Sequence, residues 1–525
     1  MFKKKGLILL LLCFSVWGIS QTRITIEDPA EWVASDLSPY VGQTVTFATP
    51  MYVCNNYYYN SGRLSISPRR IYSPTNQAIP LSEEYETIVS LNYDGMVTLT
   101  GINGYHRMGE KILNLTVKVN STSSVSAVGT PVFAGNSRAD MEKGAPSVDM
   151  RGKHRLLVCA FNLEYYLVEN LGTGYGPDNA TESNRQHTKI MNALKKIQAD
   201  IFGFVEIEQG QAALQKLAQS LTSATGRKYS YIDDGGSAYG SYTKSGYVYC
   251  EETVEPHGNL QNNNTGVVNR KKMQGFKEKA TGEVFIFSLN HFKAKSGSAS
   301  GADADQGDGQ GTFNASRVRE AQSVISAYST AKGYYQDEDI LIMGDLNAYG
   351  KEDPIRVLTD ADMTDLHRYF HADSSYSYVY HETAGYLDHA LANSTLLKQV
   401  TGMAAYHINS DEHDGFTYDK SSDQTMFRSS DHDPVLVGLT LGEDNTSDII
   451  DSNFEECYIE LRNGHPTIHY AKDGYYRIYD VSGNLCLQGR ITDTDQTIDE
   501  TLPKGFYIIH IYVEKQQKQF KLMIL

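Results

Sequence analysis

The chain has 525 residues and a formal net charge of −16. Its length is too great for one ordinary domain and predicts about two to four. The acidic balance excludes a protein that holds nucleic acid or anionic lipid by its overall charge, so a polyanionic substrate needs a local basic patch or bound cations. No close cluster of Cys and His residues suggests zinc.

The N-terminus has a basic segment, an apolar run from Leu7 to Trp17, and small residues at Gly18 and Ser20. This order is typical of a secretory signal peptide over residues 1–20, with an uncleaved anchor as the alternative. The apolar run is too short to span a bilayer comfortably, and no later stretch is apolar enough, so we expect no stable membrane insertion. Cleavage would remove three lysines and change the net charge from −16 to −19.

Residues 22–120 hold short β-type runs separated by turns, such as 43–47 and 113–119. They predict a small β-barrel or sandwich. Residues 121–150 are rich in Ser, Thr, Gly, Pro and Ala and have no clear period, which is typical of a linker or an extended strap.

Residues 151–442 change in character, because apolar runs now alternate with helical patterns. The apolar runs lie at 156–161, 201–205, 284–289, 340–343 and 434–441, and the helical patterns lie at 190–197 and 314–331. This alternation predicts an α/β fold in which layered sheets are flanked by helices. Residues 443–450 are polar and predict a second linker.

The last block, residues 451–525, is again rich in β-type runs and predicts a compact antiparallel sandwich. It contains Cys457 and Cys486, which could form a disulfide after secretion. Sequence alone does not establish that pairing.

Polar side chains follow the first four apolar runs of the middle block, where the strands are expected to end. They are Asn162, Glu164, Glu206, Asn290, His291, Asp345 and Asn347. Strand ends that lie side by side gather their polar residues into one cleft. Asp345 and Asn347 are two residues apart, so we expect their side chains to point the same way on an extended segment.

These residue types suit phosphoester hydrolysis. Glu206 is a hard carboxylate suited to Mg²⁺, Mn²⁺ or Ca²⁺. Asp345 would orient or deprotonate the attacking water, and Asn347 would donate to a phosphate oxygen. His432 would donate hydrogen bonds or protons, with its tautomer fixed by a carboxylate such as Asp388. Each segment taken alone is also typical of a capped turn or a solvated rim.

Residues 303–309 have the oxygen density of a calcium loop, but their spacing is wrong for one. They lie in Gly/Ser/Ala-rich sequence, which favours a flexible loop.

Six segments resemble, in order, the motifs of the endonuclease/exonuclease/phosphatase superfamily. They are Phe161–Tyr165, Val205–Glu206, Asn290–Lys293, Gly344–Asn347, Tyr386–His389 and Ser430–Val435. The resemblance covers about residues 150–441 and implies a four-layer α/β-sandwich. This domain would be flanked by the N-terminal β-barrel and the C-terminal β-sandwich.

The resemblance also implies roles for single residues. The metal ligands would be Asn162, Glu206 and Asp431, for Mg²⁺ or Mn²⁺ and in addition Ca²⁺. The catalytic residues would be His291, Asp345, Asn347, Asp388 and His432, with Asp388 paired to His432. Arg270 and Asn347 would bind the phosphate of the substrate. Family members often have a proline after the segment at Arg270, and this sequence lacks it. No acidic partner for His291 is identified.

Within the superfamily, residues 345–355 and 308–317 resemble large secreted bacterial nucleases. That likeness implies an oligonucleotide-binding (OB)-type barrel at residues 22–120. The C-terminal block resembles the type IX secretion sorting domain, which implies export by the type IX machinery to the outer-membrane surface or the medium.

The leading hypothesis is therefore a secreted, metal-dependent nuclease acting on DNA, with RNA left open. The alternative of the same fold is a phospholipid or sugar-phosphate phosphohydrolase, which suits the acidic charge. A non-enzymatic surface-binding protein with a decayed catalytic domain is a third hypothesis.

Overall fold

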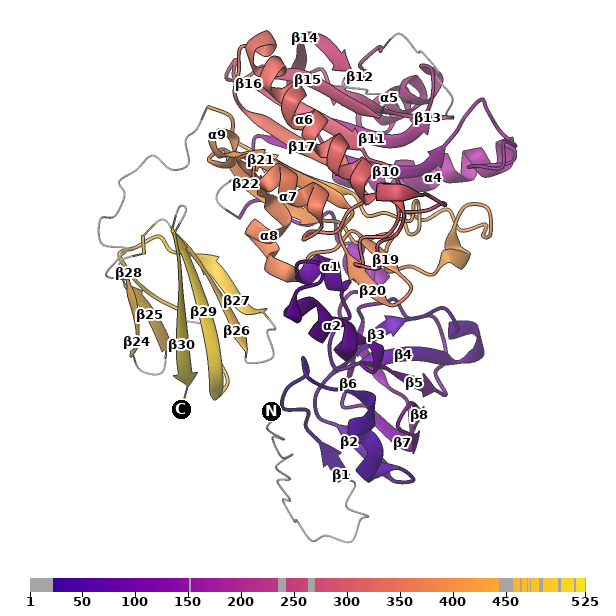
Figure 1. Cartoon of the computed structure of the whole chain (residues 1–525), viewed down its shortest axis with the longest axis vertical. Coiled ribbons are helices and arrows are strands. Elements are labelled where there is room, and N and C mark those ends of the chain that lie inside the picture. The colour runs from indigo at the N-terminus through magenta and orange to yellow at the C-terminus, as the bar shows by residue number, and fades with distance from the viewer. Residues whose placement is uncertain are drawn as a thin grey trace.

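The computed structural model in Figure 1 describes residues 22–150, 153–234, 242–262 and 270–442. It also describes residues 457–524 apart from short gaps at 463–464, 470, 473, 481–484, 499–501 and 514–515. The predicted signal peptide over 1–20 and the predicted linker over 443–450 lie outside the described residues. No helix in the described ranges is both long and apolar enough to cross a membrane.

The N-terminal region forms one nine-stranded sheet with the order β1-β2-β7-β8-β5-β4-β3-β6-β9. Its strands are β1 (Thr22–Ile24), β2 (Thr44–Phe47), β3 (Met51–Asn55), β4 (Arg63–Ser67), β5 (Val97–Thr100), β6 (Lys111–Leu113), β7 (Thr116–Ser121), β8 (Ser124–Ala127) and β9 (Val132–Ala134). Alternate residues such as Val45 and Phe47 are fully buried, as a one-sided strand requires. The strand order runs open from β1 to β9, so a closed barrel stays a prediction.

Two features of this region differ from the sequence expectations. The stretch predicted as a linker contains β8, β9 and the short helix α3 (Arg138–Met141), and both strands pair within the sheet. Val125 explains β8, since its side chain is fully buried in the core. The expected all-β region also contains α1 (Pro74–Gln77) and α2 (Glu83–Tyr93). Ser82 caps α2 by accepting a hydrogen bond from the Tyr85 backbone N–H at 3.1 Å.

The middle region contains two six-stranded sheets. The first has the order β12-β13-β11-β10-β23-β22 and the second the order β14-β15-β16-β17-β21-β18. The strands of the first are β10 (Leu156–Tyr166), β11 (Ile201–Glu208), β12 (Tyr229–Tyr231), β13 (Thr243–Cys250), β22 (Val400–Ala405) and β23 (Val435–Leu439). Those of the second are β14 (Val254–Asn262), β15 (Lys271–Glu278), β16 (Val284–His291), β17 (Ile340–Asp345), β18 (Met363–Asp365) and β21 (Asp388–Asn393).

The helices of this region are α4 (Ala180–Ile197), α5 (Ala212–Thr225), α6 (Asn314–Tyr335), α7 (Asp353–Thr359), α8 (Leu366–His371) and α9 (Ser394–Leu397). The helical patterns predicted over 190–197 and 314–331 lie in α4 and α6. Short 3₁₀ helices and the hairpin β19 (Tyr378–Tyr380) and β20 (Thr383–Gly385) lie in the connections.

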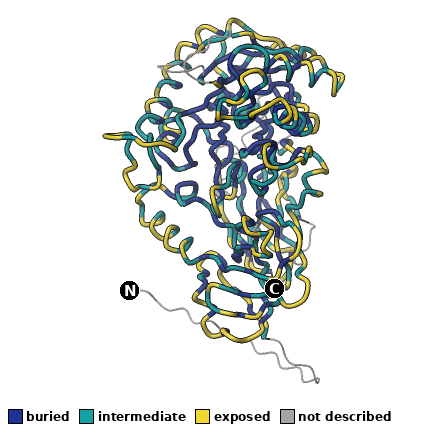
Figure 2. The backbone as a smooth tube through the Cα atoms, turned by 90° about the vertical axis from the view of Figure 1, so that its right-hand side faces the viewer, coloured by how far each residue is buried: buried dark blue, intermediate teal, exposed yellow. Residues whose placement is uncertain are grey.

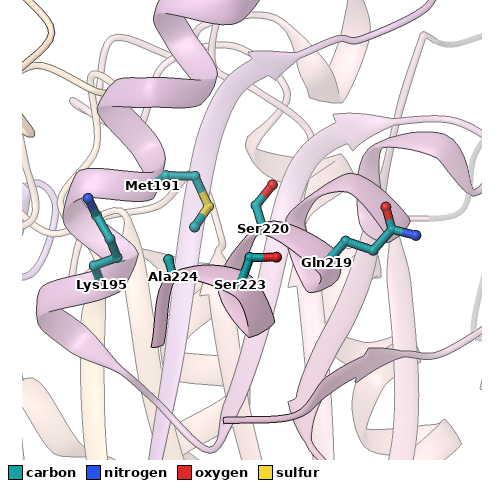
Figure 3. A pocket seen from close by; sticks show the side chains of 6 residues that line it. All are labelled: Met191, Lys195, Gln219, Ser220, Ser223 and Ala224. Atoms are coloured by element: carbon teal, nitrogen blue, oxygen red, sulfur yellow. The ribbon is translucent and has the colours of Figure 1, made fainter. Parts of the chain in front are cut away.

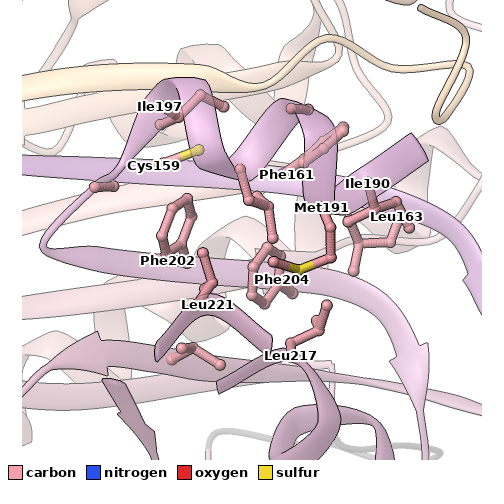
Figure 4. Close-up of a cluster of buried hydrophobic side chains, with 14 of the residues drawn as sticks. Cys159, Phe161, Leu163, Ile190, Met191, Ile197, Phe202, Phe204, Leu217 and Leu221 are labelled. Atoms are coloured by element: carbon pink, nitrogen blue, oxygen red, sulfur yellow. The ribbon is translucent and has the colours of Figure 1, made fainter. Parts of the chain in front are cut away.

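Because side chains alternate along a strand, the two faces of each sheet pack against different core clusters. In β10, Cys159 and Phe161 belong to the core cluster under α4 and α5, which Figure 4 shows. Val158 and Ala160 belong to the cluster shared with the second sheet. In the same way β17 directs Ile340 and Ile342 to the cluster that includes α6.

The two sheets therefore face each other, and helices cover their outer faces. Figure 2 shows the buried residues concentrated in the interior, with exposed residues along the outside of the chain trace. The predicted mixed α/β class is confirmed.

The C-terminal region is β-rich, as predicted. It holds β24 (Tyr458–Arg462), β25 (His465–His469) and β28 (Asp495–Thr497) in one sheet. A second sheet holds β26 (Tyr475–Asp480), β27 (Leu485–Arg490), β29 (Gly505–Val513) and β30 (Gln516–Ile524). The disulfide considered between Cys457 and Cys486 is not formed: Cys457 is buried in the core, whereas Cys486 is exposed.

Candidate active site

Sheet register brings the predicted polar residues to one edge of the two sheets. β16 runs parallel to β17, and His291 lies opposite Asp345. β21 runs antiparallel to β17, so its first residue, Asp388, also lies opposite Asp345. Gly344 allows this close pairing, because a Cβ atom there would lie 2.0 Å from the carbonyl oxygen of Asn290.

His432 and Asp388 form a buried pair. Asp388 Oδ2 lies 2.7 Å from His432 Nδ1, and it also accepts a hydrogen bond from the Ser377 hydroxyl at 2.7 Å. A carboxylate at Nδ1 fixes the tautomer and leaves Nε2 facing the site. Burial lowers the pKa of His432, but the charges of Asp388, Asp431 and Asp345 outweigh it and raise the pKa well above its usual value. The ring of Tyr378 packs on the imidazole with 4.7 Å between centroids.

Asp345 lies at the centre of the group. Its Oδ2 accepts a hydrogen bond from Asn162 Nδ2 at 3.1 Å and lies 3.7 Å from His291 Nε2 and 3.9 Å from His432 Nε2. Burial raises the pKa of Asp345 to about 7, although the charge of His432 opposes this rise. The two distances place the Asp345 carboxylate beside both predicted catalytic histidines.

Asn347 joins the group by a route that differs from the predicted extended segment. Its φ is 50°, in the left-handed region, so the chain turns directly after β17. Asp345 Oδ1 accepts a hydrogen bond from the Asn347 backbone N–H at 2.8 Å, and Asn347 Nδ2 lies 3.2 Å from Asp345 Oδ2. The predicted extended geometry is wrong, because an aspartate-centred turn forms instead.

Glu206 and Asn162 lie across from this group on the first sheet. Asn162 Nδ2 is 3.4 Å from Glu206 Oε1, and the Tyr165 backbone N–H donates to Glu206 Oε2 at 3.1 Å. The register of both β10 and β11 shifts at this point, and Glu206 has a φ of 57°. Bulges of this kind are frequent beside active sites, where they redirect side chains.

The site holds more carboxylate than cation. Burial and the charge of Asp431 raise the pKa of both Glu164 and Glu206, with that of Glu164 reaching about 8. Glu164 Oε2 is buried and has no hydrogen-bond partner in the described residues. These hard oxygen atoms carry more negative charge than the neighbouring side chains balance. Such a set of ligands suits a divalent cation such as Mg²⁺, Mn²⁺ or Ca²⁺. Glu164, Glu206, Asn162 and Asp431 are the residues that would hold it.

A different set of ligand atoms, from Asp345, Asp388 and His432, lies within 4.8 Å of one another. We assign this set to proton handling rather than to a metal. Asp388 Oδ2 accepts from the Ser377 hydroxyl and holds His432 Nδ1, which is the arrangement that orients an imidazole for proton transfer.

The surroundings of His291 are also defined. Its backbone N–H donates to the Arg270 carbonyl at 2.9 Å, which places Arg270 beside the site. His291 Nε2 lies 3.7 Å from Glu206 Oε1, so carboxylates approach it without forming a short hydrogen bond. Burial, then the charges of Arg270, His432 and Lys293, lower the pKa of His291 well below its usual value. The ring is therefore neutral.

Sequence reasoning missed the residues that hold the predicted ones in place. Ser430 donates to the Asn162 carbonyl at 2.7 Å and accepts from the His432 backbone N–H at 3.2 Å, which ties the segment before β23 to the end of β10. Asp433 accepts hydrogen bonds from the backbone of Asn409 and Ser410 at 2.8 and 3.0 Å. Ser430 and Asp433 stand in the motif beside His432, so their position was the available signal.

The acidic loop at 303–309 has no free ligand set among its described contacts. Asp303 accepts hydrogen bonds from the Ser316 backbone and hydroxyl, and Asp308 accepts from Gln310. These carboxylates serve to shape the loop.

A pocket of about 400 Å³ lies on α4 and α5, and none of its lining residues is a predicted site residue (Figure 3). It includes Ser220, whose hydroxyl lies 3.2 Å from His187 Nε2. The buried Tyr166 hydroxyl has His187 Nδ1 as its one hydrogen-bond partner among the described residues, so it donates there. The proton of the imidazole is then on Nε2, and His187 is unable to take a proton from Ser220.

Known proteins resemble the middle region. An endonuclease/exonuclease/phosphatase from Bacteroides vulgatus is 16% identical, with a TM-score of 0.37, 55% of this chain and 98% of that chain covered. A mannosyl-6-phosphatase from Bacteroides thetaiotaomicron is 16% identical, with a TM-score of 0.36 and coverage of 55% and 100%. TDP2 from D. rerio, complexed with single strand DNA product, is 13% identical, with a TM-score of 0.36 and coverage of 54% and 98%. The search of curated proteins gave no match.

The model of the Endonuclease/Exonuclease/phosphatase family matches residues 159–432, which contain every predicted site residue. The match spans more than half of the chain, and the resemblance inferred from six segments is confirmed: this protein belongs to the endonuclease/exonuclease/phosphatase family.

Proposed function

We propose that this protein is a secreted, metal-dependent phosphodiesterase, a nuclease that hydrolyses extracellular DNA by attack of water on phosphorus. The observation that carries the proposal is the placement of the buried His432–Asp388 pair against Asp345, with the donor set at Glu206 and Asn162 across the same edge. RNA is a further candidate substrate.

Each side chain has a role that its surroundings support. Asp345, with a raised pKa, takes the proton of the attacking water and orients it. His432, held cationic by Asp388, donates a hydrogen bond to a non-bridging phosphate oxygen and stabilises its growing charge. Neutral His291 and Asn347 donate further hydrogen bonds, and Arg270 supplies a fixed positive charge.

A divalent cation at Glu206, Asn162, Glu164 and Asp431 would polarise the phosphoryl oxygen and stabilise the leaving oxygen. Hydrogen bonds within the protein hold the surrounding carboxylates in place, as the bond from the Tyr165 backbone N–H to Glu206 Oε2 illustrates.

The test is a nuclease assay with the purified protein lacking residues 1–20. Supercoiled plasmid and linear DNA are incubated with Mg²⁺, Mn²⁺, Ca²⁺ or their mixtures, and with chelator. We expect cleavage that needs metal, and loss of cleavage in Asp345→Ala. Intact DNA under every metal condition, with the protein folded, would rule the proposal out.

The acidic net charge of −16 favours a second candidate, a phosphohydrolase for phospholipids or sugar phosphates. Phosphate release from a panel of lipid, sugar and nucleotide phosphates separates the two. Faster turnover of a monoester than of any diester would move the assignment to this candidate.

We further propose the organisation and location expected from the sequence. Residues 1–20 direct export, residues 22–120 form an OB-like nucleic-acid domain, and residues 151–442 form a four-layer α/β-sandwich. Residues 451–525 are the sorting signal of the type IX machinery, so the protein reaches the cell surface or the medium. Deleting residues 451–525 should leave the protein in the periplasm, which immunoblotting of cell fractions would reveal.

A further inference from the structure

Three tyrosine rings stand in a row beside the metal-ligand carboxylates. The rings of Tyr165 and Tyr175 are stacked, with 5.1 Å between centroids and 21° between planes. The ring of Tyr242 continues the row, 6.1 Å from that of Tyr175. Tyr175 and Tyr242 are 54% and 44% exposed, so the stacked rings present a contiguous aromatic surface to solvent.

The inner end of the row is joined to the active site. The backbone N–H of Tyr165 donates to Glu206 Oε2 at 3.1 Å. The row therefore leads away from the position proposed for the phosphate.

The local backbone is shaped to present the first ring. Glu164 and Tyr165 are consecutive non-glycine residues with φ of 50° and 53°, a conformation that L-residues rarely adopt. They form the irregularity between Asn162 and Tyr166 in the pairing of β10 with β11. The bulge redirects the Tyr165 side chain, as bulges at functional sites do.

The end of β11 anchors the other two segments. Glu208 accepts backbone hydrogen bonds from Val168 and Asn170 at 2.7 and 2.6 Å, which fixes the start of the loop that carries Tyr175. The backbone N–H of Gln209 donates to the Tyr242 carbonyl at 3.0 Å. The row is thus built on one strand end rather than left on free loops.

Gly176 lets the loop lie against Tyr165. A Cβ atom at Gly176 would lie 2.5 Å from the Tyr165 carbonyl oxygen, and its φ is +67°. Only glycine meets both conditions without strain. The close approach sets the stacking of Tyr175 on Tyr165.

From this row we infer that Tyr165, Tyr175 and Tyr242 form a stacking platform for unpaired bases, so that the substrate is a single-stranded segment of nucleic acid. The inference rests on the proposed function and narrows its substrate. Aromatic faces bind bases of any sequence, and they do so without the positive field that this acidic chain lacks. Bases inside a duplex have no free faces to offer.

Binding and turnover are measured separately. Fluorescence anisotropy follows a labelled 12-nucleotide oligothymidylate, single-stranded or annealed to its complement, on full-length protein in chelator. Turnover is measured with Mg²⁺ on the same strand and on bis(p-nitrophenyl) phosphate, a small diester that has no bases. The variants are Tyr175→Ala and Tyr242→Ala, with Tyr175→Phe and Tyr242→Phe as ring-retaining controls. Tyr93→Ala, at a residue 94% exposed on α2, is the surface control.

We expect each alanine variant to weaken binding of the single strand about ten-fold, at the lower end of the range for one stacked base. The phenylalanine variants and Tyr93→Ala should bind as the wild type does. Turnover of bis(p-nitrophenyl) phosphate should be unchanged in all of them. The duplex should bind less tightly than the single strand.

Alanine variants that bind the single strand like the wild type overturn the inference, as does a wild type that binds no single strand. Loss of activity on a sugar 6-phosphate but not on the strand also overturns it, in favour of a carbohydrate ring on the platform. Tyrosine-dependent binding by a protein that hydrolyses no diester would uphold the platform and reject the proposed function. Cleavage of diesters without tyrosine dependence would do the reverse.

Discussion

The segment between β22 and β23, residues 406–434, carries two clusters of charged side chains that differ in balance. In its first part, the acidic side chains form ion pairs with arginines. Asp411 contacts Arg70 at 2.5 Å, and Glu412 contacts Arg107 at 2.6 Å and Arg138 at 2.5 Å. All three arginines come from the N-terminal region, so this junction cluster fastens that region to the segment.

At its last part the acids outnumber the cations. Asp431 adds its charge to those of Glu164 and Glu206, and burial raises the pKa of all the carboxylates that it faces there. At the junction the opposite holds: burial opposes ionisation of Asp411, but Arg70 and Arg107 lower its pKa below the usual value. Matched charges fix the segment, whereas unmatched charges at its other end are held in place for a ligand.

The largest effect should come from the active-site end. His432→Ala removes the cation that faces the phosphate, so we expect kcat on DNA to fall about 10³- to 10⁴-fold. The thermal midpoint should fall as well, because the buried Asp388 carboxylate loses its cationic partner and keeps the hydrogen bond from Ser377. Initial rates and calorimetry of the purified variant measure the two quantities.

The matched control is His413→Ala, since His413 lies on the same segment with its ring between Tyr57 and Tyr59, away from Asp345. It should keep kcat within a few-fold. A His432→Ala enzyme with more than a tenth of wild-type kcat would contradict the role given to the imidazole.

The junction end should lose stability without a comparable loss of turnover. Asp411→Ala leaves Arg70 buried without its partner, a change that typically costs about 3–5 kcal/mol. We expect the thermal midpoint to fall by roughly 6–20 °C. Activity at low temperature should fall less than in His432→Ala, because no group that touches substrate is lost.

Asp414→Ala is the control for that change. Its carboxylate pairs with Lys420 on the surface of the same segment, and both side chains are about half exposed. Exposed pairs contribute about 0–1 kcal/mol, so the midpoint should hardly move. Equal destabilisation by Asp411→Ala and Asp414→Ala would mean that the junction cluster does not fasten the segment.

Divalent cations should stabilise the protein by binding at the active-site end of the segment and not at the junction cluster. At a Mg²⁺ or Mn²⁺ concentration of about 100 times Kd, the folded state gains about 2.7 kcal/mol, or roughly 5–10 °C in the thermal midpoint. Glu206→Gln should lose most of this gain, whereas Asp411→Ala should keep it. Scanning calorimetry with and without chelator gives both values. A gain that persists in Glu206→Gln would place the cation elsewhere.

The sequence was informative where structure is local. Short apolar runs predicted the strands of the middle region, and polar residues after these runs lay at the common edge, as His291 and Asp345 show. The helix α2 was missed although Ser82 and the acidic residues after it are a visible capping signal. Asn347 was misjudged because its left-handed conformation depends on a hydrogen bond to Asp345, which residue spacing does not reveal.

Contacts between distant parts of the chain were not predictable from the sequence. Ser377 holds Asp388 by a hydrogen bond, yet nothing in the sequence around it marks that role. Arg70 and Asp411 are 341 residues apart, and each alone is an ordinary charged residue. Such pairings follow from how the regions pack, so sequence patterns predicted the reacting groups better than the residues that position them.

The smallest predicted effect is a change in the stability of the protein at acidic pH. Asp411 has a folded-state pKa below its usual value, so its contribution to stability is fully present above about pH 4 and is lost as the pH falls through the folded pKa. The groups that face it are Arg70, Arg107 and His407, with hydrogen bonds from Asn136 and Tyr376. The arginines stay charged throughout, so protonation of the carboxylate itself ends the attraction.

We therefore expect the difference in thermal midpoint between wild type and Asp411→Asn to stay constant from pH 7 to about pH 5 and to shrink below about pH 4. A shift of one pKa unit corresponds to about 1.4 kcal/mol, which amounts to a few degrees here. Because asparagine does not titrate, it isolates the carboxylate from the other acids of the chain. A difference that grew on acidification would mean that Asp411 is protonated in the folded state, like the acids at the other end of the segment, and the contrast between the two clusters would fail.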